Sequence, residues 1–306
     1  MTQKKNTRYL DMGIMLTLAG GICWGFSGAC GQFLMQQRNV NAGWLVSFRM
    51  LAAGILMLVF SGVKARSWAP VTVMWKRPKT AIHMLVFGIL GMAACQLTYF
   101  VTIGLSNAGT ATVLEYLSPV MIMVYVAIRK RRFPGMIKII VLILALLGTA
   151  LLATHGQWGS LALSKEALIW GIASAVAFAL NSLLPEKLMQ EYGTIPVVGW
   201  GMVIGGLFLS IPYRVWQPSG IFDSAAILCM LGIVVIGTFI SYTGYMEGLR
   251  RIGPEKANLY ACIEPVSATA FAVLWLKSDI QMMDFVGIGC VLLAVALLSL
   301  KEKTDA

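Results

Sequence analysis

The sequence predicts an all-α, polytopic membrane protein of ten transmembrane helices, built from two inverted five-helix repeats. Three observations predict this class. Of the 306 residues, 58% are hydrophobic and only 12% are charged, and the mean hydropathy of +0.78 exceeds that of ordinary soluble domains. The chain holds about ten apolar runs, each near the length of 20 residues that crosses a bilayer as a helix. Its second half also repeats part of the first.

The apolar runs follow one another with short connections. They lie near residues 12–35, 43–62, 81–103, 107–128, 136–154, 166–184, 195–213, 225–248, 254–276 and 282–300. Helices are the expected spanning form because each helix satisfies its own backbone hydrogen bonds inside lipid. The first run is too long for the apolar core of a signal peptide, so we expect it to remain as the first helix.

The net charge of +11 follows the positive-inside rule. If the N-terminus is cytoplasmic, nineteen Lys and Arg residues fall on the cytoplasmic side and four on the other, with Arg49 inside a span. We therefore expect a multi-pass protein of the bacterial plasma membrane with both termini in the cytoplasm. The basic excess is explained by orientation, so we expect no nucleic-acid partner.

An internal repeat relates the two halves of the chain. The segments VLEYLSPV (113–120) and ACIEPV (261–266) each place a glutamate and a proline in an apolar run. Aligning Pro119 with Pro265, 146 residues later, pairs further residues without a gap: Tyr99 with Tyr245, Gly91 with Gly237, Ala111 with Ala257 and Val120 with Val266. Leu-Met-Gln at 34–36 also recurs at 188–190, and Gly-Trp at 43–44 recurs at 199–200.

Each repeat then holds five crossings, the first in residues 1–155 and the second in residues 156–306. An odd number of crossings means that the second repeat enters the bilayer from the opposite side. Inverted repeats offer two nearly equivalent arrangements, one open to each side of the membrane. The sequence therefore predicts a transporter that works by alternating access.

Three glutamates lie inside apolar runs or at their edges: Glu115, Glu247 and Glu264. A charged carboxylate at mid-helix costs about 2.5 to 3.5 kcal/mol on insertion scales, so a partner, a wet cavity or protonation must offset it. Glu247 lies next to Arg250 and Arg251, which predicts a salt-bridge cluster near the membrane surface. Glu264 is a candidate for substrate contact or for a structural or gating role.

Glu115 has two leading interpretations, beside the alternative that it faces lipid. It lies about 12 Å below one membrane surface and Arg49 about 9 Å below the same surface, by helix rise. The two could form a structural ion pair, since buried charges are usually paired. Alternatively, Glu115 faces a cavity and binds a substrate amine or a coupling proton. Pro119 and Pro265 each remove a backbone N–H, so we expect bends there with a structural or gating role.

Aromatic and amide side chains in the deeper parts of the runs are the other candidates for substrate binding. Tyrosine and tryptophan in membrane helices lie more often at the membrane surface, which is the alternative for this group. With Glu115 and Glu264, the candidates are Trp24, Tyr99, Tyr116, Asn181, Tyr242 and Tyr260.

A set of motifs follows a fixed order along the chain, at residues 24–25, 48–51, Tyr99, 108–120, Tyr245, 248–249, 252–257 and 264–266. This order resembles the drug/metabolite transporter superfamily, specifically its ten-helix EamA type. The resemblance covers nearly the whole chain and implies a central cavity lined by the first, third, fourth, sixth, eighth and ninth helices. It implies export of small metabolites without fixing the substrate. Glu115 departs from the family pattern, which often has a neutral residue there.

Motifs of other classes are missing from the sequence. It has no HExxH, P-loop, paired CxxC or nucleophile elbow, so we expect no enzyme activity, no cofactor and no metal site. Transport would be driven by substrate or ion gradients. The leading hypothesis is export of amino acids or related amine-bearing compounds, and the alternatives are uptake of an organic cation and, in another class, a membrane enzyme or lipid scramblase. The expected partners are a small-molecule substrate and membrane lipid; proton coupling and a homodimer are left open.

Overall fold

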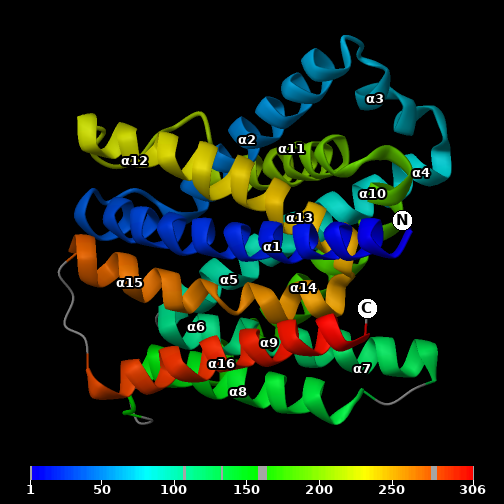
Figure 1. Cartoon of the computed structure of the whole chain (residues 1–306). Helices are drawn as coiled ribbons and strands as arrows, with labels where there is room; N and C mark the ends of the chain where they lie inside the picture. The colour runs from blue at the N-terminus through cyan, green and yellow to red at the C-terminus, as the bar shows by residue number, and fades with distance from the viewer. Residues whose placement is uncertain (1, 106–107, 132–133, 158–163, 277–280, 306) are drawn as a thin grey trace.

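The structure is a computed structural model that describes residues 2–105, 108–131, 134–157, 164–276 and 281–305. Within these ranges the chain forms helices and no strands. Nine of the described helical segments are long and apolar enough to cross a membrane, and Met282–Leu298 is a shorter apolar helix. Figure 1 shows that the N- and C-termini lie at the same end of the helices. The all-α membrane fold predicted from the sequence is confirmed.

The first repeat contributes five crossings, and short helices connect the second to the third. Its elements are α1 (Thr2–Gln32), η1 (Phe33–Gln37), α2 (Ala42–Ala65), α3 (Ala69–Thr72), η2 (Val73–Lys76), α4 (Pro78–Val86), η3 (Phe87–Ala93), α5 (Ala94–Leu105), α6 (Ala108–Glu115), α7 (Ser118–Lys130) and α8 (Met136–Thr154).

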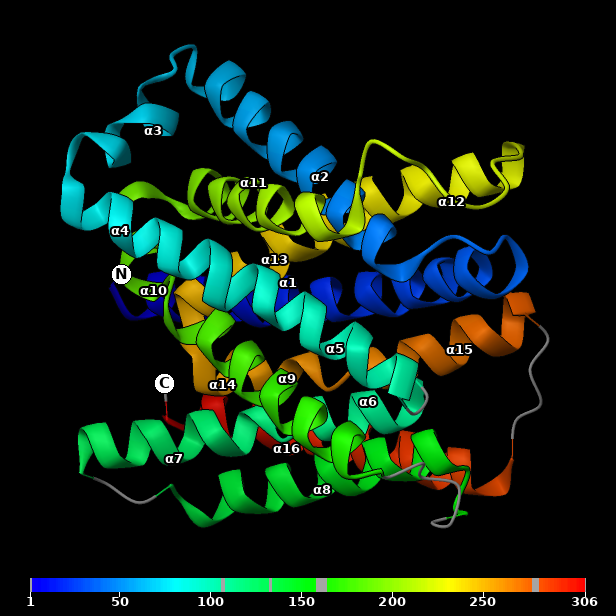
Figure 2. The same ribbon diagram turned by 180° about the vertical axis from the view of Figure 1, so that it is seen from behind.

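The second repeat has the same order. Its elements are α9 (Lys165–Leu183), α10 (Glu186–Tyr192), α11 (Thr194–Tyr213), α12 (Ser224–Val234), η5 (Val235–Ile240), α13 (Ser241–Ile252), α14 (Pro254–Ala261), α15 (Glu264–Leu276) and α16 (Met282–Asp305). The second crossing packs along the seventh (α2 with α11) and the fifth along the tenth (α8 with α16). These two pairs flank α1, α5, α9 and α13 (Figures 1 and 2).

Both repeats interrupt their helices at the same places. A π-helical turn, η3 or η5, divides the third and the eighth crossing. The fourth crossing breaks between α6 and α7, and the ninth between α14 and α15. Pro119 and Pro265 each stand at the second position of the helix after the break, where the missing N–H costs no helical bond. Both helices are thus interrupted directly before the two prolines, where the sequence predicts bends.

Two matching hydrogen bonds join the repeats at opposite ends of the bundle. Trp44 Nε1 donates to the Val215 carbonyl oxygen at 2.8 Å, and Trp200 Nε1 donates to the Val71 carbonyl oxygen at 2.8 Å. Trp44 and Trp200 are the tryptophans of the repeated Gly-Trp pair. The inverted symmetry read from the sequence therefore appears in the tertiary contacts.

We expect Trp44→Phe and Trp200→Phe to destabilise the fold by similar amounts. Each removes one partly buried hydrogen bond and leaves a carbonyl without its donor, which costs about 1 kcal/mol. The measurement is the thermal unfolding midpoint in detergent, with Trp170→Phe as control because its side chain is exposed. A loss in only one of the two variants would show that the two bonds are not equivalent.

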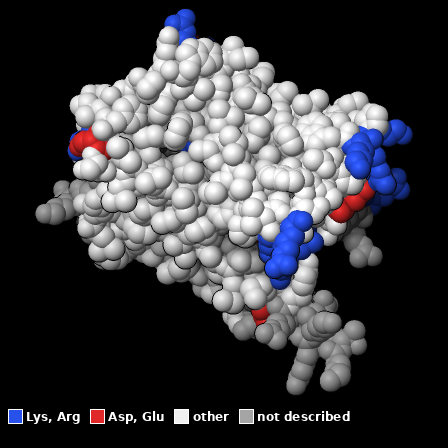
Figure 3. Space-filling model, turned by 90° about the horizontal axis from the view of Figure 1, so that it is seen from above, with Lys and Arg blue, Asp and Glu red and all other residues white. Residues whose placement is uncertain are grey.

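The surface separates charge from apolar side chains. In the view of Figure 3, Lys and Arg gather mainly at one end of the molecule, and the broad surface between the two ends is nearly free of charge. Large apolar side chains on the outside of the helices are exposed, among them Ile128, Ile143, Ile211, Leu228 and Leu274. Such an uncharged band is what lipid contact requires.

Candidate substrate cavity

A central cavity of about 560 Å³ lies between the two repeats. This volume is in the usual range for small-molecule sites. Its lining comes from the first, third, fourth, sixth, eighth and ninth crossings, as the resemblance implied, and also from the second and fifth. Gly28 and Gln32, near the end of α1, are exposed lining residues. The cavity therefore opens at the end of the bundle away from the termini.

The carboxylate of Glu115 lies at the end of α6 and faces this cavity. Ser174 Oγ donates to Glu115 Oε1 at 2.9 Å, and Cys95 Sγ donates to the same oxygen at 3.8 Å. Both donors are neutral. They orient the carboxylate without compensating its charge, so Glu115 can still attract a cation that enters the cavity.

Arg49 also lines the cavity, but it does not pair with Glu115. Its guanidinium donates to Gln96 Oε1, and Gln96 Nε2 lies 2.6 Å from the Tyr242 hydroxyl oxygen. Among the described side chains, no ion pair joins Arg49 to a carboxylate. The structural ion pair between Arg49 and Glu115, one of the two interpretations of the sequence, is therefore not formed. Gln96, on α5, is the partner of Arg49 in place of Glu115.

A double-mutant cycle tests this separation. We expect the losses of stability from Arg49→Gln and Glu115→Gln to add within about 0.5 kcal/mol, as they do for sites that share no contact. If the two residues formed an ion pair, the double variant would lose less stability than the sum of the two single losses. Unfolding midpoints of the four proteins in detergent measure the coupling.

Glu264 has a neutral partner with two roles. The Tyr116 hydroxyl oxygen lies 3.0 Å from Glu264 Oε2 and 3.1 Å from the Ala261 carbonyl oxygen. Ala261 is the last residue of α14, and Pro265, four residues later, has no N–H to donate to its carbonyl oxygen. A hydroxyl has one proton, so Tyr116 cannot donate to both oxygens at once. The Ala261 carbonyl oxygen, at the break in the ninth crossing, and the Glu264 carboxylate, in the cavity, therefore compete for the hydroxyl proton of Tyr116.

An aromatic layer forms the inner wall of the cavity. The ring of Trp24 lies 5.0 Å from that of Tyr242, 4.7 Å from that of Tyr245 and 6.4 Å from that of Phe178, measured between centroids. These rings come from both repeats and three of them are buried. They separate the cavity from the end of the bundle that carries the termini.

The candidate residues divide into two groups. The structure brings together in the cavity lining Trp24, Arg49, Tyr99, Glu115, Tyr242, Glu264 and Pro265. Tyr116, Pro119, Asn181 and Tyr260 lie outside the lining. Tyr116 still reaches the cavity through Glu264, whereas Asn181 and Tyr260 are completely buried.

The sequence interpretation missed three residues of the site. Ser174 and Cys95 bind Glu115, and Phe178 lines the cavity beside Trp24. Cysteine and serine give no signal inside an apolar run, because either is an ordinary small packing residue there. Phe178 could have been found, because extending the Leu-Met-Gln alignment pairs it with Trp24.

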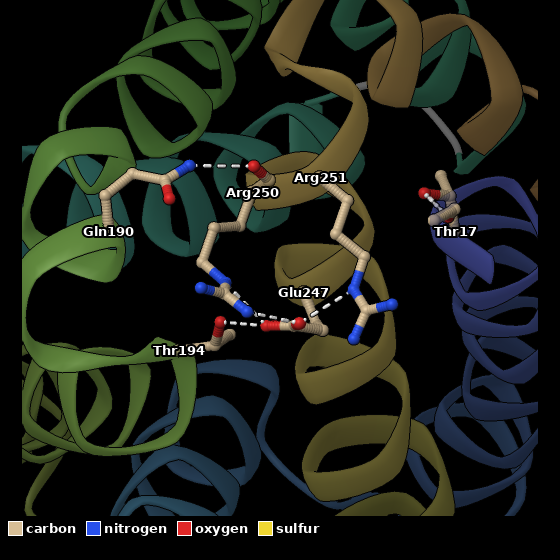
Figure 4. A network of polar contacts seen from close by, with 7 residues as sticks. Thr17, Gln190, Thr194, Glu247, Arg250 and Arg251 are labelled. Carbon is tan, nitrogen blue, oxygen red and sulfur yellow. Dashed lines mark hydrogen bonds and ion pairs between the residues drawn. The ribbon is translucent and has the colours of Figure 1, made fainter. Parts of the chain in front are cut away.

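A charged cluster around Glu247 lies toward the termini end of the bundle (Figure 4). Arg250 Nη2 lies 2.6 Å and Arg251 Nε 2.8 Å from Glu247 Oε1, and Thr194 Oγ1 donates to Oε2. The guanidinium of Arg251 also lies 4.8 Å from the ring centroid of Tyr9 on α1. The predicted salt-bridge cluster is confirmed, and it joins α13 to α11 and α1.

The model of the EamA-like transporter family matches this chain twice, over residues 11–154 and 165–300. The chain belongs to the EamA-like transporter family. The two matches follow the two halves of this EamA-like transporter, in agreement with its repeated helices and with the resemblance seen in its motifs.

Similar proteins support a membrane transporter. The chain is 37% identical over 294 residues to the "Uncharacterized inner membrane transporter YicL" of Salmonella typhimurium, covering 96% of this chain and 97% of the relative. It is 22% identical to the "Uncharacterized inner membrane transporter YedA" of Escherichia coli K12, covering 84% and 81%. A crystal structure shares the fold, with a TM-score of 0.74, 15% identity and 99% coverage of both chains.

Proposed function

We propose that this EamA-like transporter is a secondary transporter that exports amino acids or related amine-bearing compounds by alternating access. The observation that carries the proposal is the charge of its cavity. Glu115 and Glu264 face one space and are held by neutral donors, while Arg49 is the cation that lines it among the described residues. With all three ionised, the cavity has a net negative charge and favours a cationic group in the substrate.

The position of Arg49 favours a substrate that also carries an acidic group. Its guanidinium binds a neutral amide, so its charge is available to a substrate carboxylate. A zwitterion can place its ammonium group near Glu115 and its carboxylate near Arg49. The proposed contacts are Glu115, Glu264, Trp24, Tyr99 and Tyr242, and the aromatic rings offer an apolar surface for a side chain.

Uptake of an organic cation is the second candidate. The same carboxylates and the rings of Trp24 and Tyr242 would suit a quaternary or protonated amine. Such a substrate leaves Arg49 without a partner of opposite charge in the cavity. The arrangement of Arg49 and Gln96 therefore favours the amino-acid proposal.

Proton coupling fits the geometry of Glu264. When Glu264 is ionised, it competes with the Ala261 carbonyl for the one proton of Tyr116. When Glu264 is protonated, its own O–H donates to Tyr116, and Tyr116 donates to Ala261, so both acceptors are satisfied. We propose that Glu264 carries the coupling proton and that Glu115 binds the substrate amine.

The proposed location is a bacterial plasma membrane with both termini in the cytoplasm. Two relatives carry "inner membrane transporter" in their names, and the clustering of Lys and Arg at one end of the molecule agrees with a cytoplasmic face there (Figure 3). In this orientation the cavity opens outward. Residues 1–155 and 156–306 are the two units proposed to move against each other.

Flux measurements in proteoliposomes test the proposal. The panel holds amino acids, monoamines, polyamines and a quaternary ammonium compound, each at two pH values, with uptake and efflux recorded separately. Saturable movement of amino acids driven by a pH gradient supports the proposal. Movement of quaternary cations alone supports the second candidate, and binding of anions without any amine would overturn both.

A further inference from the structure

A buried polar cluster lies on the closed side of the aromatic layer, between the cavity and the termini end. It consists of Ser182, Tyr245 and Asn258, with Asn181 next to Ser182 on α9, and all four residues are at most 1% exposed. The Ser182 Oγ lies 3.0 Å from the Tyr245 hydroxyl oxygen, and Asn258 Nδ2 donates to Ser182 Oγ at 3.0 Å. The cluster joins α9, α13 and α14, and none of its four side chains is in the cavity lining, although the ring of Tyr245 belongs to the aromatic layer.

The cluster is incompletely satisfied in this conformation. Both polar atoms of the Asn181 side chain, and Asn258 Oδ1, are buried without a hydrogen-bond partner among the described residues. Buried amides without partners are rare because they lose their hydrogen bonds to water without replacement. Two of them in one cluster between apolar helices indicate a place that is hydrated in another conformation.

The internal repeat indicates which conformation would hydrate these residues. The Leu-Met-Gln alignment pairs Asn181 with Ser27 and Ser182 with Gly28, and the Pro119 alignment pairs Tyr245 with Tyr99 and Asn258 with Thr112. All four counterparts line the open cavity: Ser27, Gly28, Tyr99 and Thr112. The same four positions are thus open in one repeat and closed in the other.

We propose that Asn181, Ser182, Tyr245 and Asn258 form the second, closed half of the transport pathway. The proposal rests on the alternating access of the proposed function. In the opposite state these four residues line a water-filled cavity that is open at the termini end. Their counterparts close in turn, and Gly28 packs against Tyr99 and Thr112 as Ser182 now packs against Tyr245 and Asn258.

Gly28 provides a way to prevent that exchange. A Cβ atom at Gly28 would have no neighbour within 4 Å, so a larger side chain fits in the present conformation. In the opposite state the same side chain would collide with Tyr99 and Thr112. Gly28→Leu should therefore hold the protein in the conformation described here. Gly289→Leu is the matched control, because Gly289 lies on α16 and also has no neighbour within 4 Å.

The test measures thiol accessibility and needs no substrate. Single cysteines are placed by Ser182→Cys or Asn258→Cys, in a variant whose six native cysteines are alanine. Right-side-out and inverted membrane vesicles are treated with a membrane-impermeant maleimide, and a cleavable N-terminal tag identifies the termini face. Gly28→Cys serves as the reporter for the open cavity and should react from the opposite face.

We expect the cysteines of Ser182→Cys and Asn258→Cys to react from the termini face. Adding Gly28→Leu should slow both reactions about tenfold. Gly289→Leu should leave the rate unchanged. The proposal would be overturned if neither Ser182→Cys nor Asn258→Cys reacted, or if Gly28→Leu left their reaction rates unchanged. Because no substrate enters the assay, this failure would be independent of the flux measurements, which test the proposed function by themselves.

Discussion

Replacing Glu115 by glutamine is expected to abolish amine transport while the protein remains folded. Truncating one partner of a buried charge pair costs about 2 to 5 kcal/mol, so binding of an ammonium group should weaken by at least about 30-fold. Stability should change little, because the amide oxygen of glutamine can still accept from Ser174. The measurement is substrate flux in proteoliposomes together with the unfolding midpoint in detergent.

Glu166→Gln is the matched control, because Glu166 is an exposed residue in the first turn of α9. Its flux should equal that of the parent protein. If the Glu115→Gln variant showed unchanged flux, Glu115 would have a structural role and would not bind the substrate. A variant that instead moves a neutral analogue of the substrate would show that the carboxylate selects the charge.

Replacing Glu264 by glutamine is expected to separate substrate movement from the proton gradient. The amide cannot release a proton, but it can donate to Tyr116 as a protonated Glu264 would. Exchange of labelled for unlabelled substrate should persist, whereas accumulation driven by a pH gradient should fall at least about tenfold. Substrate-induced proton flux, followed with a dye inside the liposomes, provides the direct measurement.

Tyr116→Phe distinguishes a coupling role of Glu264 from a structural one. It removes the shared hydroxyl and leaves the carboxylate in place, so the pH dependence of transport should shift rather than disappear. Other ionisable groups of the same cavity include Arg49, Cys95, Tyr99 and Glu115, and they stay unchanged in both variants. If the Glu264→Gln variant still coupled substrate flux to proton flux, another group would have to carry the coupling proton.

Much of the fold could be predicted because lipid imposes strict demands on sequence. Spanning helices need long apolar runs, and their orientation needs basic residues on one side of the membrane. Both features can therefore be predicted from the composition and order of the residues. The paired Glu-Pro segments located the breaks at residues 116–117 and 262–263, since proline removes a backbone donor in any setting. The repeated motifs also predicted the inverted symmetry that the contacts of Trp44 and Trp200 display.

Partners across the bundle were decided only by the tertiary structure. Depth along a helix placed Arg49 and Glu115 at similar levels, but depth carries no information about rotation around the helix axis. The packing of α5 turned Gln96 toward Arg49, and the packing of α9 turned Ser174 toward Glu115. Which of the two equivalent halves is open was likewise not in the sequence, because inverted repeats give both arrangements nearly the same local interactions.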